Sequence, residues 1–343
     1  MKALVWEAPR EMALRDRPTP EVAAGEALIR VAYAGICGSE LSAYLGHNAL
    51  RVPPLVMGHE FTGTVAALGS TAQARNPALA AGLAVTVNPL TFCGQCDFCI
   101  HGQHQLCTRR QLIGAHRAGG YAEYVAVPAE TIVPLPAGMA PYLGALVEPL
   151  AVSVRVVEHA LGEGAAPAPL LVIGAGPIGL LVLQVLRVRG AAQVFVADLD
   201  AARLAMAADL GAEPLDPRER DVVETVREAS GGLGAPVTID AVGTAATRAP
   251  CVAATRSGGT LVLCGLHEET SAMPAAEIIR REIVARGTFA YTPANFTTAL
   301  ALLAEGVVRL DPWIVEAPLA EGGRWFERLL EEPGNVAKVL LIP

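Results

Sequence analysis

The stretch Leu170-Leu171-Val172-Ile173-Gly174-Ala175-Gly176-Pro177-Ile178-Gly179 joins a short apolar run to a spaced set of glycines. Such a run before a glycine turn predicts a buried strand that leads directly into a helix, here from Ile178. Gly174 permits the tight turn, Gly176 lets the backbone approach a pyrophosphate, and Gly179 lets the helix pack on the strand. The helix N-terminus offers free N–H groups and partial positive charge to phosphates. The stretch therefore predicts a dinucleotide-binding turn.

An acidic residue follows at the distance that this turn requires. Asp198 ends the next predicted strand, about 20 residues on, and can accept hydrogen bonds from both hydroxyls of a ribose. A carboxylate there repels a 2′-phosphate, so Asp198 favours NAD over NADP, although Arg203 offers a guanidinium that can also hold phosphate. The predicted coenzyme-binding residues of this part are Gly174, Gly176, Pro177, Ile178, Gly179 and Asp198.

The segments around this turn predict an α/β fold. The predicted strands are Leu170–Gly174, Gln193–Asp198, Val237–Asp240, Thr260–Gly265 and Ile283–Ala290, and predicted helices begin at Val152, Ile178 and Ala201. Apolar strands separated by helical stretches predict a doubly wound parallel sheet. Upstream of about residue 150 the chain instead shows short β segments such as 27–31 and 83–87, punctuated by Gly and Pro.

The length of 343 residues suits two domains. We expect a β-rich domain of residues 1–150 and 292–343 and a dinucleotide-binding domain of residues 151–291. A helix from about Phe296 to Glu305 precedes the strand 339–342, which we expect to return to the first domain.

Composition narrows the function classes. The formal net charge is −8 with no basic run, which argues against nucleic-acid binding. The longest apolar stretch, 170–186, is broken by glycines, a proline and a glutamine, so it does not fit a membrane span. The chain has seven cysteines, four of them clustered, and its start lacks a signal-peptide layout. We therefore predict reduced, metal-bound thiols and a cytoplasmic location.

Four cysteines form one cassette with two-, two- and seven-residue spacers: Cys93, Cys96, Cys99 and Cys107. Four thiolates on one loop can close a tetrahedral Zn²⁺ shell and leave no position for a substrate. The cassette therefore predicts a structural zinc site that staples its loop. An iron–sulfur cluster uses similar spacing, but the sequence offers no other electron-transfer feature.

A second constellation has the composition of an open metal site. Cys37 and His59 are zinc-type ligands, Glu60 is adjacent to the histidine, and Glu148 follows in a Glu-Pro pair. A catalytic zinc takes three protein ligands and keeps one position for water or substrate. We expect Cys37 and His59 to bind the metal, with either Glu60 or Glu148 as the third ligand.

Taken together, these residues resemble the zinc-dependent medium-chain dehydrogenase/reductase family over nearly the whole chain. The pattern Gly58-His59-Glu60-x2-Gly63-x5-Gly69 resembles that family's zinc signature. Glu148, in place of a second cysteine, is similar to the polyol and threonine dehydrogenase branch, which includes sorbitol and galactitol-1-phosphate dehydrogenases. The resemblance implies a GroES-like β domain plus a Rossmann domain, and dimers or tetramers formed through the Rossmann sheet edge.

The resemblance also implies roles for individual residues. Arg203 would join Asp198 at the adenosine end of NAD, and Ser39 would be the first hydroxyl of a proton relay. Ser42 stands where the family often has a histidine, while His47 lies in the same loop at another spacing. Residues that would line the nicotinamide side are Cys264, Gly265, Leu266, Thr288, Phe289 and Ala290. Ala290 also stands where sorbitol dehydrogenases have an arginine, which argues against sorbitol as the substrate.

The implied function is oxidation of a secondary alcohol to a ketone by hydride transfer to NAD. Zn²⁺ would act as a Lewis acid on the substrate hydroxyl, with Ser39, Glu60 and Glu148 as the catalytic residues. The expected substrate is a polyol, sugar alcohol or sugar-alcohol phosphate, and Arg51, His116 and Arg117 are candidates to hold a phosphate. The residues also allow a threonine or butanediol dehydrogenase as an alternative. A non-enzymatic NAD-binding relative is a further alternative, which the intact zinc ligands oppose, whereas zinc-free quinone or enoyl reductases lack the Cys37 and His59 pair.

Overall fold

The computed structural model describes all residues 1–343, and the chain forms two compact units. The first consists of residues Met1–Glu148, Thr292–Gly306 and Asp311–Pro343, and the second of Pro149–Tyr291 and Val307–Leu310. The first unit is therefore assembled from three separate pieces of chain, with the second unit inserted between them.

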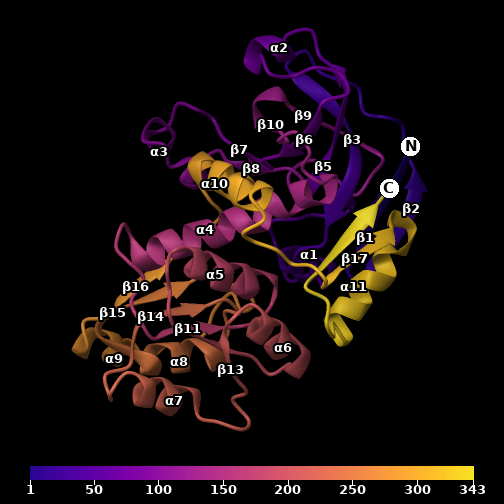
Figure 1. The fold of residues 1–343 in the computed structure, drawn as a ribbon. Coiled ribbons are helices and arrows are strands. Elements are labelled where there is room, and N and C mark those ends of the chain that lie inside the picture. The colour runs from indigo at the N-terminus through magenta and orange to yellow at the C-terminus, as the bar shows by residue number, and fades with distance from the viewer. The chain divides into compact units, whose positions relative to one another are not determined.

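The first unit is built on antiparallel β-structure (Figure 1). Its strands are β1 (Lys2–Ala8), β2 (Glu11–Asp16), β3 (Glu26–Gly35), β4 (Leu55–Val56), β5 (Glu60–Leu68), β6 (Ala84–Val87), β7 (Leu90–Thr91), β8 (Gln111–Leu112), β9 (Tyr124–Pro128), β10 (Ile132–Pro134), β17 (Ile314–Pro318) and β18 (Lys338–Ile342). Its helices are α1 (Gly38–Tyr44), α2 (Ala72–Arg75), α3 (Asp97–Ile100), α10 (Pro293–Ala304) and α11 (Gly322–Glu331).

The main sheet of this unit runs in the order β10-β6-β5-β3-β18-β17, with β9 also paired to β3. Its alternating apolar residues face a core that includes Ile29, Phe61, Val85 and Val339. Strand β18 pairs antiparallel to β3, with Leu341 opposite Ala34, so the late strand returns to this unit as expected. The same pairing brings residue 338 to the part of the unit that holds β5.

The second unit is a six-stranded parallel sheet in the order β13-β12-β11-β14-β15-β16. Its strands are β11 (Leu170–Ile173), β12 (Val194–Ala197), β13 (Glu213–Leu215), β14 (Ala235–Asp240), β15 (Thr255–Leu263) and β16 (Val284–Gly287). Its helices are α4 (Val147–Leu161), α5 (Pro177–Val188), α6 (Ala201–Asp209), α7 (Val222–Ala229), α8 (Ala245–Ala254) and α9 (Ala275–Arg280).

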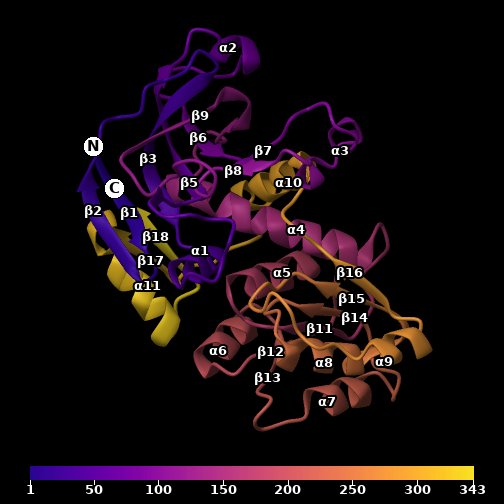
Figure 2. The same cartoon turned by 180° about the vertical axis from the view of Figure 1, so that it is seen from behind.

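Helices cover both faces of this sheet, with α4 and α5 on one side and α7, α8 and α9 on the other (Figures 1 and 2). The predicted doubly wound parallel fold is thus confirmed. Several boundaries differ from the prediction, and two of them concern the predicted coenzyme site. The helix of the glycine turn begins at Pro177, a residue whose fixed φ suits the first helical position. The last strand ends at Gly287, so residues 288–290 lie beyond it.

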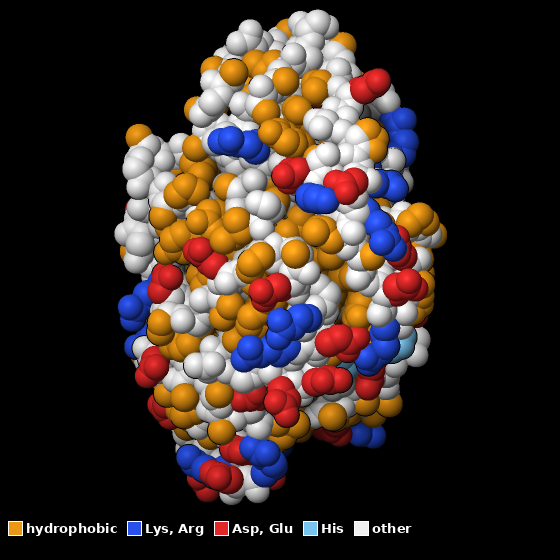
Figure 3. Space-filling model, turned by 90° about the vertical axis from the view of Figure 1, so that its right-hand side faces the viewer, with side chains coloured by type: hydrophobic (Ala, Val, Ile, Leu, Met, Phe, Trp, Pro, Cys, Tyr) orange, Lys and Arg blue, Asp and Glu red, His pale blue; other side chains and the backbone are white.

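Two further features are the distribution of charge on the surface and the length of the helices. On the face drawn in Figure 3, acidic and basic side chains are interspersed, and neither sign gathers into one large patch. Not one of the helices combines the length and the apolarity that a bilayer crossing requires.

Candidate functional site

A cluster of three side chains that could hold a metal ion lies in the first unit. Cys37 caps the start of α1, and His59 and Glu60 stand at the start of β5. One candidate ligand atom from each lies within 4.8 Å of the other two. Gly58 makes the approach to β5 possible, because its φ is +97° and a Cβ there would collide with Tyr121.

Glu40, which the sequence analysis missed, organises this cluster. It is fully buried and accepts hydrogen bonds from His59 Nδ1 at 2.8 Å, the Gly58 amide at 2.9 Å, the Cys37 amide at 3.1 Å and the Tyr121 hydroxyl. Because Nδ1 of His59 is committed to Glu40, Nε2 is left as the metal-binding nitrogen. Glu40 is the third residue of a helix capped by Cys37, and that spacing is the sequence signal that could have revealed it.

The charges of this network are strongly coupled. Burial opposes ionisation of Glu40, but the neighbouring His59 and Arg51 outweigh it and lower the pKa of Glu40 to about 2. Burial likewise opposes charging of His59, yet the carboxylate of Glu40, assisted by Cys37, raises the pKa of His59 well above its usual value. Without a metal the pair is therefore an imidazolium and a carboxylate. A metal ion must displace the proton on Nε2 to bind.

Lys338 holds Glu60, and the sequence analysis missed this residue as well. Its Nζ donates to both carboxylate oxygens of Glu60, at 2.7 and 2.9 Å, and to the Ile36 carbonyl at 3.1 Å. Both side chains are buried, and despite the cost of burial the charge of Glu60 raises the pKa of Lys338. Glu148, in the first turn of α4, is also buried and contributes to the same rise.

The predicted relay residue lies beside Cys37. Ser39 Oγ is 3.5 Å from Cys37 Sγ and accepts a hydrogen bond from Arg51 Nη2 at 3.3 Å. His47 is exposed. Tyr44, at the end of α1, directs its hydroxyl to Glu327 at 2.7 Å and to the Arg10 carbonyl, and so joins α1 to α11.

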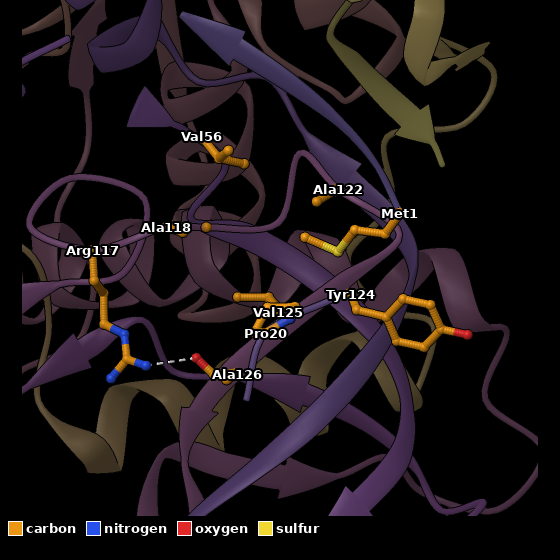
Figure 4. A pocket seen from close by; sticks show the side chains of 10 residues that line it. Met1, Pro20, Val56, Arg117, Ala118, Ala122, Tyr124, Val125 and Ala126 are labelled. Carbon is orange, nitrogen blue, oxygen red and sulfur yellow. Dashed lines mark hydrogen bonds between the residues drawn. The ribbon is translucent and has the colours of Figure 1, made fainter. Parts of the chain in front are cut away.

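The three candidates for phosphate binding are all engaged in other contacts. Arg51 is buried and bonds to Ser39 and the Gly114 carbonyl. His116 accepts the Leu112 amide at 2.9 Å. Arg117 donates to Glu26 and to the Ala126 carbonyl beside a small apolar cavity of about 160 Å³ (Figure 4). That cavity is lined by residues such as Met1, Val56 and Val125, which offer nothing to a phosphate.

The four cysteines of the cassette converge as their spacing suggested. Sγ atoms of Cys93, Cys96, Cys99 and Cys107 all lie within 4.8 Å of one another. Backbone hydrogen bonding at Gln95 lowers the pKa of Cys93 to about 5, whereas burial raises that of Cys99 to about 12. The amides of Cys93 and Arg109 also donate to Cys107 Sγ, at 3.4 and 3.3 Å. Such amide donors stabilise thiolates, and the donor set fits a closed Zn²⁺ shell.

In the second unit, the glycine turn has the geometry that a dinucleotide needs. A Cβ on Gly179 would lie 1.8 Å from the Gly174 carbonyl oxygen, so only glycine allows helix α5 to start so close to β11. A Cβ on Gly176 would meet nothing within 4 Å, so space is open above the backbone where a pyrophosphate would approach. Asp198 Oδ2 accepts the Ala175 amide at 2.7 Å, which fixes this carboxylate against the turn.

The remaining predicted coenzyme residues lie at carboxyl ends of the same sheet. Arg203 is half-buried in the first turn of α6. Cys264 and Gly265 follow β15, and both of their amides donate to the carbonyl of Asp240 at the end of β14. Leu266 and Phe289 are exposed, and Thr288 donates its amide to Leu263. Asp240 was missed, and its carboxylate also accepts the Val242 and Gly243 amides, which orders the adjoining loop.

A zinc-type cluster and a dinucleotide turn in one chain define a class: metal-dependent oxidoreductases that use a nicotinamide coenzyme. Comparison with known proteins agrees with this class. Residues 23–137 match the alcohol dehydrogenase GroES-like domain, and residues 177–305 match the zinc-binding dehydrogenase domain. The chain belongs to the zinc-dependent medium-chain dehydrogenase family, in the branch that contains the polyol dehydrogenases.

Similar proteins cover the full chain. L-galactonate-5-dehydrogenase of Escherichia coli (strain K12) is 34% identical over 96% of this chain and 95% of its own. D-arabitol-phosphate dehydrogenase of Enterococcus avium is 33% identical over 99% and 97%. A solved zinc-binding dehydrogenase from Sinorhizobium meliloti 1021, bound to NADP, has a TM-score of 0.89 at 31% identity and covers 100% of this chain and 99% of its own. The protein is an enzyme of this family, with zinc and a nicotinamide dinucleotide as its cofactors.

Proposed function

We propose that this enzyme oxidises a secondary hydroxyl of an unphosphorylated polyol, sugar alcohol or sugar acid to the ketone, with NAD as the hydride acceptor. The observation that carries the proposal is the cluster of Cys37, His59 and Glu60, backed by Glu40 and Lys338, in a chain that also contains the Gly174–Gly179 turn. Dehydrogenases of galactonate, arabitol phosphate and sorbitol are among the similar proteins. We favour substrates without phosphate, because the three candidate phosphate-binding residues all bond to other protein groups: Arg51, His116 and Arg117.

We assign the third ligand of the catalytic zinc to Glu148, which lies outside the cluster that Cys37, His59 and Glu60 form in this structure, so its carboxylate would have to move to the metal. Glu60 lies within the cluster, but both of its oxygens accept from Lys338, so metal binding by Glu60 would have to separate a buried ion pair. Cys37, His59 and Glu148 would complete the shell, while Glu60 stays with Lys338. Replacing Glu148 with glutamine should then remove about one zinc per chain, whereas Glu60→Gln should retain it. Zinc analysis of both variants decides between them, and the reverse pattern would transfer the role to Glu60.

The chemistry would divide between cofactors and protein. When bound, zinc would polarise the substrate hydroxyl, and NAD would accept the hydride from the carbon that carries this hydroxyl. Glu40 would fix His59, and Lys338 would limit the negative charge near the metal. Ser39 would accept the hydroxyl proton while its own proton passes to water, which takes up the net proton of the reaction. The cassette of Cys93, Cys96, Cys99 and Cys107 would hold the second zinc and order its loop.

The choice of coenzyme would rest on Asp198. Its carboxylate is fixed against the glycine turn by the Ala175 and Asp200 amides, where it would accept from ribose hydroxyls and repel a 2′-phosphate. The similar protein bound to NADP makes a direct comparison of both coenzymes necessary. We expect a higher kcat/KM with NAD, and Asp198→Ser should reduce that preference. A preference for NADP in the unaltered enzyme would overturn this assignment.

The decisive experiment is reduction of NAD across a panel of polyols, sugar acids, polyol phosphates, threonine and 2,3-butanediol, followed as NADH absorbance. The proposal requires turnover of an unphosphorylated polyol or sugar acid, and its loss when zinc is chelated. If kcat/KM is highest for a polyol phosphate, threonine or butanediol, that compound's class becomes the proposed substrate class instead. No zinc-dependent turnover of any alcohol would reject the function.

We also propose that the enzyme forms a homodimer and that it lies in the cytoplasm. Strand β16 forms an edge of the parallel sheet and is exposed along its whole length, as a pairing strand of a second copy would require. A homodimer through this edge would double the sheet, and analytical ultracentrifugation tests it.

All seven cysteines are free thiols, which favours a reducing compartment such as the cytoplasm. Cell fractionation checks that prediction.

A further inference from the structure

Arg51 is a buried cation without a direct carboxylate partner. Only 3% of its surface is exposed, and none of its hydrogen bonds goes to an acidic side chain. Burial of a guanidinium is costly unless its donors are used and its charge is balanced. The hydrogen bonds of Arg51 must therefore offset the cost of burying its charge, and they indicate what the residue does.

The first contacts fix Ser39. Arg51 Nη1 donates to the Ser39 carbonyl and Nη2 donates to Ser39 Oγ, each at 3.3 Å. The side-chain amide of Asn48 donates to the same carbonyl at 3.4 Å. With one lone pair of Oγ accepting from Arg51, the hydroxyl is held 3.5 Å from Cys37 Sγ. Ser39 would otherwise be a free rotor, because a serine hydroxyl turns to suit its surroundings.

Another contact of Arg51 reaches the loop that supports His59. Arg51 Nε donates to the Gly114 carbonyl at 3.2 Å. Gly114 packs against the backbone of the zinc signature, where a Cβ on it would lie 2.8 Å from Gly58. Nη2 of Arg51 also lies 3.4 Å from His59 Nδ1. One guanidinium thus spans the helix of Cys37 and the loop that supports His59.

The charge of Arg51 is balanced through this same site. Glu40 bonds to His59 Nδ1, and Arg51 is one of the cations that stabilise the ionised form of Glu40. The fork of a guanidinium suits this task, because it directs separate donors to acceptors on two segments, which a lysine ammonium cannot do from one point.

We propose that Arg51 is a positioning residue of the catalytic site, which acts through Ser39 by holding its hydroxyl in place beside Cys37. The inference rests on the proposed alcohol oxidation, in which Ser39 relays the substrate proton. It also removes Arg51 from the candidates for a phosphate contact. Its action through Ser39 is what separates it from a residue that merely stabilises the fold.

A double-mutant cycle tests the proposal. We expect Arg51→Met to lower kcat about 10- to 100-fold on every accepted alcohol, with little change in KM, and Arg51→Lys to lower it less. In a Ser39→Ala background, Arg51→Met should add less than about twofold, because the residue through which it acts is gone. Independent, multiplicative losses would overturn the proposal. A loss confined to the KM of phosphorylated alcohols would instead make Arg51 a phosphate contact.

Cobalt substitution gives a readout that needs no turnover. Ser39→Ala, Arg51→Met and Arg51→Lys should each shift the thiolate-to-cobalt absorption band of the Cys37 site, the first two by a similar amount. Arg117→Met, which removes a half-exposed arginine bonded to Glu26, is the matched control and should leave both band and kcat unchanged. An unshifted band in all Arg51 variants would contradict the proposal. If the wild-type chain oxidises no alcohol, the function fails, while the band still reports on Arg51.

Discussion

The two sulfur-containing clusters of this chain differ in how they are assembled. The cassette draws all four thiols from Cys93–Cys107, and the hydrogen bonds to its sulfurs come from nearby amides and thiols. The Cys37 cluster instead draws on α1, the start of β5 and β18, and its charged neighbours Glu40, Arg51 and Lys338 are buried. A closed shell needs only a short loop, whereas an open site must be held rigid by residues far apart in sequence.

The largest expected effect separates the clusters by function. Cys37→Ser removes a thiolate ligand, so it should abolish metal binding at that site and lower turnover by roughly 10³-fold or more. Binding of NADH, measured by fluorescence, should be unchanged. Zinc-dependent turnover close to that of the unaltered enzyme would reject Cys37 as a ligand.

Cys99→Ser is the matched change in the cassette. It should also cost one zinc per chain, but turnover per folded molecule should stay within about twofold, because a closed shell takes no part in the reaction. The loss should appear as a lower unfolding midpoint. If this variant loses turnover while it keeps its stability, the division between a structural and a catalytic site is wrong.

Lys338→Met tests whether the Cys37 cluster depends on a residue that is far away in the sequence. It leaves Glu60 buried without its cation, which should cost about 3–5 kcal/mol in the free energy of unfolding. The double variant Lys338→Met/Glu60→Gln removes both charges and should regain part of that loss. Urea titration measures both, and a single variant as stable as the parent would show that the pair is unimportant.

Glu40→Gln should weaken zinc binding at the Cys37 site, but less than Cys37→Ser does. It keeps the size of the side chain but removes the charge that orients His59, so zinc affinity should fall about 10- to 100-fold. Competition with a chromogenic chelator gives the affinity. Glu327→Gln, which alters a carboxylate bonded to Tyr44 and Arg10 instead, is the control expected to leave the affinity unchanged.

The smallest effect concerns pH in the metal-free protein. The pKa of Glu40 is lowered to about 2, so its contribution to stability is present above the unfolded value of 4.5 and is lost as the pH falls toward 2. The pKa of His59 is raised, so its contribution is present below the unfolded value of 6.5 and is lost as the pH rises above it. In EDTA, Glu40→Gln should therefore lower the unfolding midpoint more at about pH 5.5 than at about pH 8.5, a comparison in which the opposite pH dependence of Cys93, present in both proteins, cancels. An equal loss at both pH values would contradict the assignment.

Local patterns predicted much of this molecule. The glycine turn, the parallel sheet and the convergence of four cysteines follow from short-range spacing, which a sequence displays directly. Lys338 and Glu40 could not be found in that way. A lysine in an apolar strand and a glutamate in a short helix have ordinary surface roles, and only tertiary pairing shows that they are buried beside His59 and Glu60. Lys338 had one faint signal: it is one of only two lysines among 26 basic residues.

The pairing of Lys338 with Glu60 has a consequence for biosynthesis. The two residues are 278 positions apart, with the whole dinucleotide unit between them. A ribosome adds about 5–20 residues per second, so a nascent chain spends roughly 14–56 seconds with Glu60 made and its cation absent. During that interval the cassette, complete soon after residue 107, can already load its ion. The cassette can therefore be complete early in synthesis, whereas the Glu60–Lys338 pair can form only after the second unit has been synthesised.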